Sequence, residues 1–210
     1  MSAVLKDNDV VNAINGMDGW EYDDVYRCLR KEFAFDSFES AATFVQHVAK
    51  LASEVGHYPE ILIYTDGSSR GNPGPGGYGI IIQQFSDKRS KEFSQGFRKT
   101  TNNRMELLAV IEALKKLTVK NLKVHIYTDS KYVVDAVEKK WVFKWKKTKF
   151  KGKKNSDLWS MFLEIYDTQK IKFFWIKGHN NHPQNERCDY LAFEASKSKK
   201  LEIDHEYEKE

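Results

Sequence analysis

The chain has 210 residues, of which 40% are hydrophobic and 30% charged, a composition typical of a soluble globular protein with one or two domains. No run of 18 apolar residues occurs, and the first residues lack the basic and apolar regions of a signal peptide, so we expect a cytoplasmic protein without a membrane partner. Cys28 and Cys188 are 160 positions apart, which argues against a disulfide framework.

The charge is distributed unevenly along the chain. The net charge of +4 is the sum of −6 over residues 1–60, +14 over residues 61–200 and −4 over residues 201–210. A basic middle between acidic ends indicates a polyanionic partner such as nucleic acid, although lysine-rich surfaces also occur simply for solubility.

The first sixty residues predict a small α+β segment. We expect a short helix at 8–15 and a strand or hairpin between Trp20 and Phe35. An amphipathic helix is expected over 37–55, with Ser37 as its N-cap.

From residue 61 onward, strand and helix patterns alternate. Strands are predicted at 61–64, 78–85, 93–97, 122–128 and 171–176, and helices at 103–117, 131–138, 156–166 and 184–199. Residues 67–77 are expected to form a turn-rich loop, and the acidic tail 201–210 is expected to be frayed. The order of elements predicts an α/β fold with a five-stranded mixed sheet whose first three strands are antiparallel. Residues 139–154 contain nine lysines, four aromatic residues and no acidic residue.

Four carboxylates stand at positions that favour a metal site. Asp66 and Asp129 each end an apolar strand, in ILIYTD and VHIYTD, and ligands gather at the carboxyl ends of strands in such sheets. Glu106 falls in the first turn of a helix, and Asp189 lies early in the last helix. Individually, such residues are often turn formers or partners of a helix dipole. Together, they would repel one another without a cation, and oxygen ligands select Mg²⁺ or Mn²⁺.

The segments around these carboxylates resemble the four signature blocks of bacterial type 1 ribonuclease H, in that family's order. They are TDGSSRGNPGPGGYG (65–79), TTNNRMELLAVIEAL (100–114), YTDSKYVVDAV (127–137) and WIKGHNNHPQNERCDYLA (175–192). The resemblance implies a ribonuclease H-like fold over residues 61–200. It also implies a sequence-nonspecific endonuclease that hydrolyses the RNA strand of RNA–DNA hybrids, leaving 5′-phosphate and 3′-hydroxyl ends.

The same resemblance implies roles for individual residues. Asp66, Glu106, Asp129 and Asp189 correspond to the carboxylates that hold two Mg²⁺ ions, with Mn²⁺ as a possible substitute. His179 corresponds to a histidine on a mobile loop that assists proton transfer or product release.

The resemblance also implies substrate contacts. Positions that reach the minor groove of the hybrid, or approach the RNA sugar, map to Ser69, Asn72, Asn102 and Asn103. A phosphate pocket for the DNA strand maps to Lys99, Thr101 and Asn155, and an aromatic channel maps to Tyr132, Trp141 and Trp145. Helix capping by Asn102 and Asn103, and packing of Trp141 and Trp145 against the core, are the competing interpretations. The lysines around the two tryptophans favour a nucleic-acid groove with steeply salt-dependent affinity.

The N-terminal segment resembles the first half of pterin-4a-carbinolamine dehydratases. The resemblance rests on Trp20, on the FxFxxFxxAxxFVxxVAxLA run over 33–52 and on HYP (57–59). Because the second half of that family is absent, we expect residues 1–60 to be a truncated, noncatalytic appendage, followed by the nuclease domain at 61–200 and the tail at 201–210.

Other functions fit the sequence less well. A hybrid-binding module without catalysis is disfavoured by the full set of carboxylates, and a second, pterin dehydratase activity by the missing half. A reverse transcriptase fragment would need a polymerase segment. Zinc bound by His179, His182 and Cys188 would lack a second ligand pair, and a nucleotide-binding loop would need GK[ST]. No obligate protein partner is implied, and we expect a monomer.

Overall fold

The computed structural model describes residues 6–23, 28–54, 60–84, 90–178, 180 and 182–209. His179 and the HYP segment (57–59) lie outside the described residues. The chain divides into two compact units, Met1–Tyr58 and Pro59–Glu210, which are treated separately below. None of the helices in the described ranges is long and apolar enough to cross a membrane.

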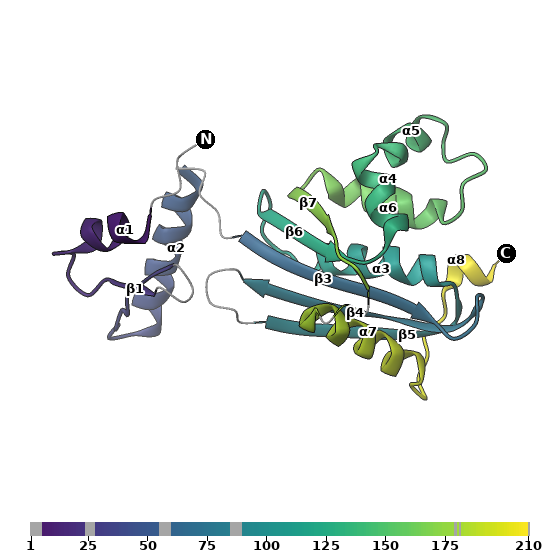
Figure 1. Cartoon of the computed structure of the whole chain (residues 1–210), viewed down its shortest axis with the longest axis horizontal. Coiled ribbons are helices and arrows are strands. Elements are labelled where there is room, and N and C mark those ends of the chain that lie inside the picture. Colours follow the sequence, from purple (N-terminus) through teal and green to yellow (C-terminus); the bar gives the residue numbers. More distant parts are fainter. Residues whose placement is uncertain are drawn as a thin grey trace. The chain divides into compact units, whose positions relative to one another are not determined.

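The first unit combines helices with a small antiparallel sheet. Its described elements are α1 (Asp7–Ile14), β1 (Glu21–Asp23), β2 (Cys28–Arg30) and α2 (Phe38–Glu54) (Figure 1). The Ser37 hydroxyl accepts a hydrogen bond of 3.1 Å from the Ser40 amide, which caps α2 as predicted. The ring of Phe44 packs against Phe33 and Phe35, with centroids 4.6 and 5.2 Å apart. The α+β character predicted for this segment is therefore confirmed.

Five strands of the second unit form one mixed sheet in the order β5-β4-β3-β6-β7. They are β3 (Glu60–Ser69), β4 (Gly74–Gln84), β5 (Ser90–Thr100), β6 (Lys123–Thr128) and β7 (Lys170–Trp175). The β3–β4 and β4–β5 pairs are antiparallel, whereas β3–β6 and β6–β7 are parallel. This arrangement confirms the predicted fold class, because two helical crossovers are needed to bring β6 and β7 into parallel register.

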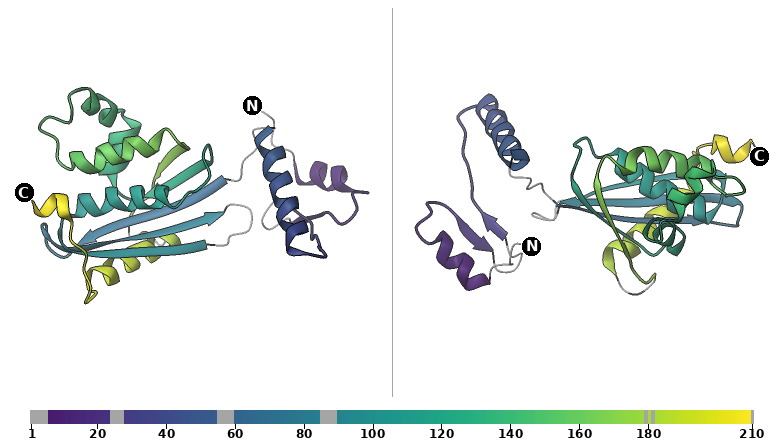
Figure 2. Two further views of the ribbon diagram at one scale, coloured as in Figure 1. Left: turned by 180° about the vertical axis from the view of Figure 1, so that it is seen from behind. Right: turned by 90° about the horizontal axis from the view of Figure 1, so that it is seen from above.

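Helices pack on both faces of the sheet. On one face, α3 (Asn102–Lys115) buries Met105, Leu107 and Ile111 completely against the strands. On the other face, α7 (Pro183–Ser196) packs on β3, β4 and β5 (Figure 2). The close approach of α7 requires glycine, since a Cβ on Gly79 would stand 2.1 Å from the carbonyl oxygen of Cys188. The sheet thus holds α3 and α7 at fixed positions beside the ends of β3 and β6.

The glycine-rich segment was predicted as an eleven-residue loop, and this prediction is wrong in extent. Strand β3 continues to Ser69 and β4 starts at Gly74, with Ser69 paired to Gly76. The glycines of β4 resemble turn signals in the sequence, yet they serve as strand positions over which α7 passes closely.

The basic segment is more helical than predicted. Helices α4 (Lys131–Glu138) and α6 (Ser156–Tyr166) coincide with the predicted ranges, but α5 (Trp141–Lys147) was predicted only as a lysine-rich stretch. It begins after Lys140, whose left-handed φ of 57° turns the chain out of α4. Trp159 and Phe162 of α6 are completely buried and anchor this part of the fold.

The acidic tail was expected to be frayed, and this expectation is wrong for residues 201–209. Glu202 pairs with the neighbouring β5 through its backbone, since its amide donates to the Gly96 carbonyl at 2.8 Å. Asp204 is only 8% exposed and accepts two hydrogen bonds of 2.7 Å from the Arg104 guanidinium. The last described element is α8 (His205–Glu208). A buried cation therefore holds the tail, which sequence patterning alone did not indicate.

Candidate active site

Two aspartates lie just beyond the paired stretch of the neighbouring parallel strands β3 and β6, Asp66 within β3 and Asp129 directly after β6. Tyr64 of β3 pairs with Tyr127 of β6, so Asp66 and Asp129 follow two residues later on the same side of the sheet. Asp66 is 7% exposed, and Asp129 is half-buried. The parallel register therefore brings together two carboxylates that are more than sixty residues apart in sequence.

Glu106 reaches the same place from the first turns of α3. Gly67 makes this possible, because a Cβ at that position would stand 2.2 Å from the Glu106 backbone nitrogen. Carboxylate oxygens of Asp66, Glu106 and Asp129 all lie within 4.8 Å of one another. The fold thus collects a triad of acidic side chains from a strand, a helix and a strand end.

Asp189, on α7, stands beside this triad. After burial and the charge of Asp129, the nearby Asp189 carboxylate also raises the pKa of the Asp66 carboxyl. The four carboxylates identified in the sequence are therefore brought together, although Asp189 is not among the three whose oxygens form the tight group.

The electrostatics of the cluster are unfavourable without a cation. Burial is the largest cause that raises the pKa of Asp66 from 3.8 to about 8, followed by the charges of Asp129 and Asp189. Burial, and then the charges of Asp66 and Asp129, also raise the pKa of Glu106 well above its usual value. Within the described residues, Glu106 Oε2 is buried and has no hydrogen-bond partner. A buried, unpaired oxygen among like charges is what a hard divalent cation would satisfy, so the donor set fits Mg²⁺ or Mn²⁺.

The surroundings of Asp129 hold its main chain in place. The indole Nε1 of Trp175 donates to the Asp129 carbonyl at 3.0 Å, and the Asn185 amide lies 3.5 Å from Asp129 Oδ2. A Cβ on Gly178 would stand 2.3 Å from the same carboxylate oxygen. The backbone at Gly178 therefore lies directly against the Asp129 carboxylate, and His179 lies outside the described residues.

The predicted minor-groove residues form a second group around the start of α3. Asn72 is exposed in the β3–β4 connection, and its side-chain oxygen accepts a 3.3 Å hydrogen bond from the Asn102 amide. Asn103 is exposed, whereas the Ser69 hydroxyl is buried without a partner in the described part of the chain. The Asn102 side chain also hydrogen-bonds Glu106. Thr101 occupies the N-cap position without a side-chain cap, so neither asparagine acts as the cap.

The predicted phosphate pocket and aromatic channel meet at Asn155. This residue has a left-handed φ of 58° at the start of α6, and its amide donates to the Tyr132 hydroxyl at 3.0 Å. Trp159 donates to the same hydroxyl at 2.8 Å. Thr101 is half-buried and Lys99 is exposed. The Tyr132 hydroxyl thus fixes the position of the Asn155 amide.

Trp141 and Trp145 lie on α5 with ring centroids 6.5 Å apart. Trp141 is 41% exposed and does not pack into the core, whereas the half-buried Trp145 ring lies 5.9 Å from that of the fully buried Trp159, so the alternative of core packing holds for Trp145 only. Lys139 stands 5.0 Å from the Trp141 ring centroid, and Lys153 stands 5.3 Å from that of Trp145. The segment therefore presents alternating aromatic and cationic groups at the surface.

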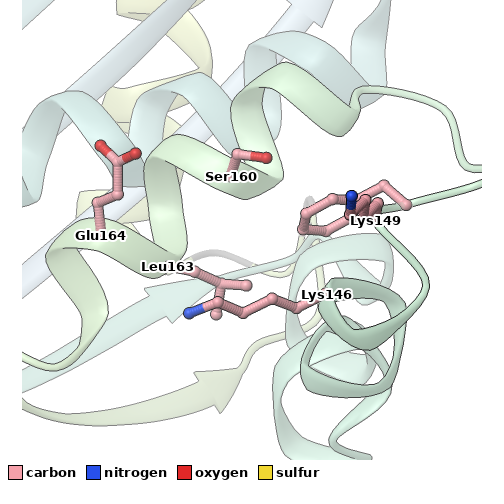
Figure 3. A pocket seen from close by; sticks show the side chains of 6 residues that line it. Lys146, Lys149, Ser160, Leu163 and Glu164 are labelled. Carbon is pink, nitrogen blue, oxygen red and sulfur yellow. The ribbon is translucent and has the colours of Figure 1, made fainter.

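A pocket of about 350 Å³ lies between the end of α5 and α6. It is lined by Lys146, Lys149, Phe150, Ser160, Leu163 and Glu164 (Figure 3). No member of the carboxylate cluster lines it, so this hollow belongs to the basic segment and not to the acidic site.

Sequence reasoning missed Arg104, which is only 4% exposed. Its guanidinium donates to Asp157 at 2.7 and 2.9 Å and to Asp204 at 2.7 Å, and it lies 3.5 Å from the Asn155 oxygen. The one signal in the sequence was its place in NNRME, between the asparagines and Glu106. Arg104 thereby connects the phosphate-pocket position Asn155 to the C-terminal tail.

Comparison with protein families gives two matches that divide the chain. The RNase H family model matches residues 59–197. The family model for pterin 4 alpha carbinolamine dehydratase matches residues 3–67. The two matches overlap over residues 59–67, which include most of β3.

Individual relatives match the second region over nearly their whole length. A protein named ribonuclease H from Trichodesmium erythraeum is 48% identical over 154 residues, which are 71% of this chain and 96% of that protein. A ribonuclease H from Desulforamulus reducens is 49% identical over 150 residues, covering 69% of this chain and 92% of the relative.

Solved structures resemble the same region. LC9-RNase H1, described as a type 1 RNase H with the type 2 active-site motif, aligns with a TM-score of 0.61 and 31% identity, covering 67% of this chain and 73% of that one. The N-terminal RNase H domain of a Mycobacterium tuberculosis protein aligns with a TM-score of 0.53 and 27% identity, covering 66% of this chain and 94% of the other.

Proposed function

Because this chain belongs to the ribonuclease H family, we propose that it is an endonuclease that hydrolyses the RNA strand of RNA–DNA hybrids without sequence preference. Asp66, Glu106, Asp129 and Asp189 would hold two Mg²⁺ ions, with Mn²⁺ as a substitute. The products would carry 5′-phosphate and 3′-hydroxyl ends.

The observation that carries this proposal is the acidic triad with an unpaired buried oxygen. Asp66, Glu106 and Asp129 converge within 4.8 Å, and Glu106 Oε2 has no partner among the described residues. A structural role for these three carboxylates, two of them buried, would require donors around them, and burial followed by their mutual repulsion raises the pKa of both Asp66 and Glu106. Bound divalent cations would both coordinate the unpaired oxygen and offset the repulsion between the carboxylates.

The chain's own residues orient the reaction. Divalent cations held by these carboxylates would supply the activation of a water for in-line attack on phosphorus and the stabilisation of the departing 3′-oxygen. Asp66 and Glu106 come from rigid elements whose contact at Gly67 fixes their separation. Asn185 lies within 3.5 Å of Asp129 Oδ2 and restrains that carboxylate. We assign His179 to proton transfer or product release on the grounds of family resemblance.

Strand discrimination would come from two separate surfaces. Ser69, Asn72, Asn102 and Asn103 surround the start of α3 and offer both donors and acceptors to sugar hydroxyls and minor-groove base edges. Lys99, Thr101 and Asn155 would hold a phosphate of the DNA strand. Tyr132, Trp141 and Trp145 would line the deoxyribose path, since stacked rings tolerate a sugar that lacks the 2′-hydroxyl.

We propose that residues 1–60 form a noncatalytic appendage and that residues 61–200, with the tail 201–210 packed on them, carry the activity. The support is that relatives named ribonuclease H match this chain over 92% or more of their own length without the first unit. We propose a cytoplasmic monomer with the hybrid as its substrate.

The test is a metal-dependent cleavage assay on matched RNA–DNA, RNA–RNA and DNA–DNA duplexes. We expect cleavage of the hybrid alone, only with divalent metal, and mapping of the fragment ends should show 5′-phosphate and 3′-hydroxyl groups. Asp66→Asn and Asp129→Asn should abolish cleavage while hybrid binding persists, and Asp167→Asn, at an exposed position, is the matched control. Cleavage of all three duplexes would refute the proposed strand discrimination.

A further inference from the structure

A row of three aromatic rings crosses the sheet beside the carboxylate cluster. Tyr64, Tyr127 and Phe174 occupy directly paired positions on β3, β6 and β7. Ring centroids are 5.0 Å apart between the two tyrosines and 4.9 Å apart between Tyr127 and Phe174, with planes inclined by 20° and 13°. The rings therefore stack continuously from the central strand to the edge strand β7.

This row runs from a covered to an uncovered part of one sheet face. Tyr64 is 7% exposed and packs with Cys188 of α7, whereas Tyr127 and Phe174 are half-buried. In Figure 1, α7 lies over β4 and β5 and away from β6 and β7. Since α7 packs mainly on β3, β4 and β5, the outer end of the row lies beyond its cover.

Basic side chains lie on this face around the outer end of the row. Next to the aromatic row, His125 of β6 pairs with Lys172 of β7, and one step further Lys123, which forms a 3.6 Å ion pair with Glu60, pairs with Lys170. The ammonium of Lys172 stands 4.8 Å from the Phe174 ring centroid, and no carboxylate pairs with it among the described residues. Flat rings backed by lysines complement a partner that combines planar groups with negative charge, as nucleic acid does.

The aromatic row also lies next to the carboxylates, where the proposed function places the RNA strand that is cut. Asp66 and Asp129 stand two residues beyond Tyr64 and Tyr127 on the same strands, about 7 Å further at the usual rise of a β-strand. That distance is on the order of two stacked nucleotides. An RNA strand whose phosphodiester lies at the carboxylates is therefore close enough to contact the aromatic row.

We propose that Phe174 and Lys172 form a stacking site for an unpaired nucleotide of the RNA strand where it leaves the hybrid, an inference that rests on the proposed function. Bases inside the duplex have neighbours on both faces, so only an unpaired base offers a free face to Phe174. Lys172 would move from the ring to the adjacent phosphate, while Tyr127 and Tyr64 support the ring from behind. Such a contact is tolerant of sequence, because every base has a π-face.

The kinetic test compares blunt hybrids with hybrids that carry about six unpaired nucleotides on the 5′ or the 3′ end of the RNA or of the DNA strand. For the unchanged protein we expect an RNA flank at one end to lower KM about 5- to 10-fold, as one stacked base provides. Phe174→Leu should lose this preference and retain the kcat for blunt hybrids. The control is Phe93→Leu on the opposite edge strand β5, where Lys116 lies 5.1 Å from a half-buried ring.

A binding measurement separates this proposal from the proposed function. The fluorescent base 2-aminopurine in the RNA flank, with a chelator present, should be quenched on binding to the unchanged protein and to Phe93→Leu but not to Phe174→Leu. Lys172→Gln, which changes an exposed side chain and leaves the Phe174 ring in place, should weaken the flank preference and guards against a folding defect in Phe174→Leu. An RNA flank without effect, a preference that survives Phe174→Leu, or a preference for DNA flanks alone would overturn the stacking site. Failure to cleave any blunt hybrid would instead overturn the proposed function.

Discussion

At the scale of single residues, the close packing that brings the carboxylates of the site together also makes their negative charges unfavourable. Gly67 lets α3 approach β3 so closely that Glu106 and Asp66 share one space. The same closeness raises the pKa of both carboxyl groups, because burial and like charge each disfavour the ionised forms. The repulsion between the carboxylates therefore persists until bound cations neutralise their charge.

Asp66 should make the metal-free protein less stable as pH rises. Its pKa is about 8 in the fold against 3.8 as its ordinary value, so between these pH values the unfolded chain has released a proton that the folded chain keeps. The contribution to stability is therefore complete below about pH 4 and is lost as pH rises to about 8. We expect the Tm of the unchanged protein, relative to that of Asp66→Asn, to fall over this window in chelator. Added Mg²⁺ should reduce the fall, and parallel pH profiles for the two proteins would contradict this explanation.

Gly67→Ala should impair both folding and activity. The new Cβ would stand 2.2 Å from the Glu106 nitrogen, so α3 must shift away from β3. Overpacking of this kind costs about 1–3 kcal/mol of the free energy of unfolding, and the displaced Glu106 should lower kcat far more than it raises KM. Urea unfolding and steady-state kinetics measure the two effects. Gly152→Ala is a control in open space, although its φ of 69° adds backbone strain of its own. Normal kcat in Gly67→Ala would show that the close contact does not position Glu106.

At the scale of elements, α5 is a case in which the sequence predicted the character of the surface but not the secondary structure. Its composition indicated a nucleic-acid surface. The helix was not predicted, because the segment lacks the regular apolar stripe from which a helix is recognised in a sequence. Conversely, β3 and β6 were predictable because ILIYTD and VHIYTD both end in the aspartates that meet across parallel strands. The glycine-rich start of β4, residues 74–77, was predicted as loop, because the reason for glycines in this strand is α7, more than a hundred residues later.

The lysines of α5 should control the salt dependence of hybrid binding. Lys144, Lys146 and Lys147 are exposed in its last turn. Each phosphate that a lysine no longer neutralises should flatten the slope of log K against log salt by about 0.9, so the triple change to Gln should flatten it by about 2 to 3. Binding isotherms between low and moderate salt provide the measurement. Gln at Lys115, Lys116 and Lys120, at the far end of α3 from Glu106, is the charge-matched control, and an equal effect there would mean that α5 has no special role.

At the scale of the whole molecule, the chain combines a region that belongs to the ribonuclease H family with an N-terminal segment that matches a second family model. The RNase H match starts at residue 59 and the pterin dehydratase match ends at residue 67, so the two matches overlap over most of β3. The tail, by contrast, lies beyond the RNase H match and still packs on β5 and Arg104. Its anchoring could not be predicted from the sequence, because one buried arginine and an aspartate a hundred residues later show no local pattern.

Removal of residues 1–58 should leave hybrid cleavage within about threefold of the full chain. The physical reason is that the carboxylates and their supporting contacts all lie in the second unit. Comparison of kcat/KM for the two proteins on one blunt hybrid is the measurement. A loss of activity that is restored by adding back the first unit in trans would show that the appendage takes part in catalysis.

Asp204→Asn should destabilise the second unit by about 3 kcal/mol, the lower end of the range for breaking a buried ion pair. Arg104 would still pair with Asp157 but would no longer face a charged partner at position 204. The control Glu206→Gln removes an exposed pair with Lys209 and should change the free energy of unfolding by under about 0.5 kcal/mol. Equal effects of the two changes in urea unfolding would show that the Arg104–Asp204 pair carries no particular weight.

The Arg104–Asp204 pair also has a consequence for the order of synthesis. Domains begin to fold as they leave the ribosome, and Arg104 emerges about a hundred residues before its partner in the tail. Until Asp204 has left the ribosome, Asp157 is the one carboxylate among the described residues with which the almost fully buried Arg104 guanidinium can pair. The ribonuclease H region therefore completes this ion pair only after the segment around Asp204 has emerged, and chains terminated before residue 204 are expected to be unstable and removed by proteases.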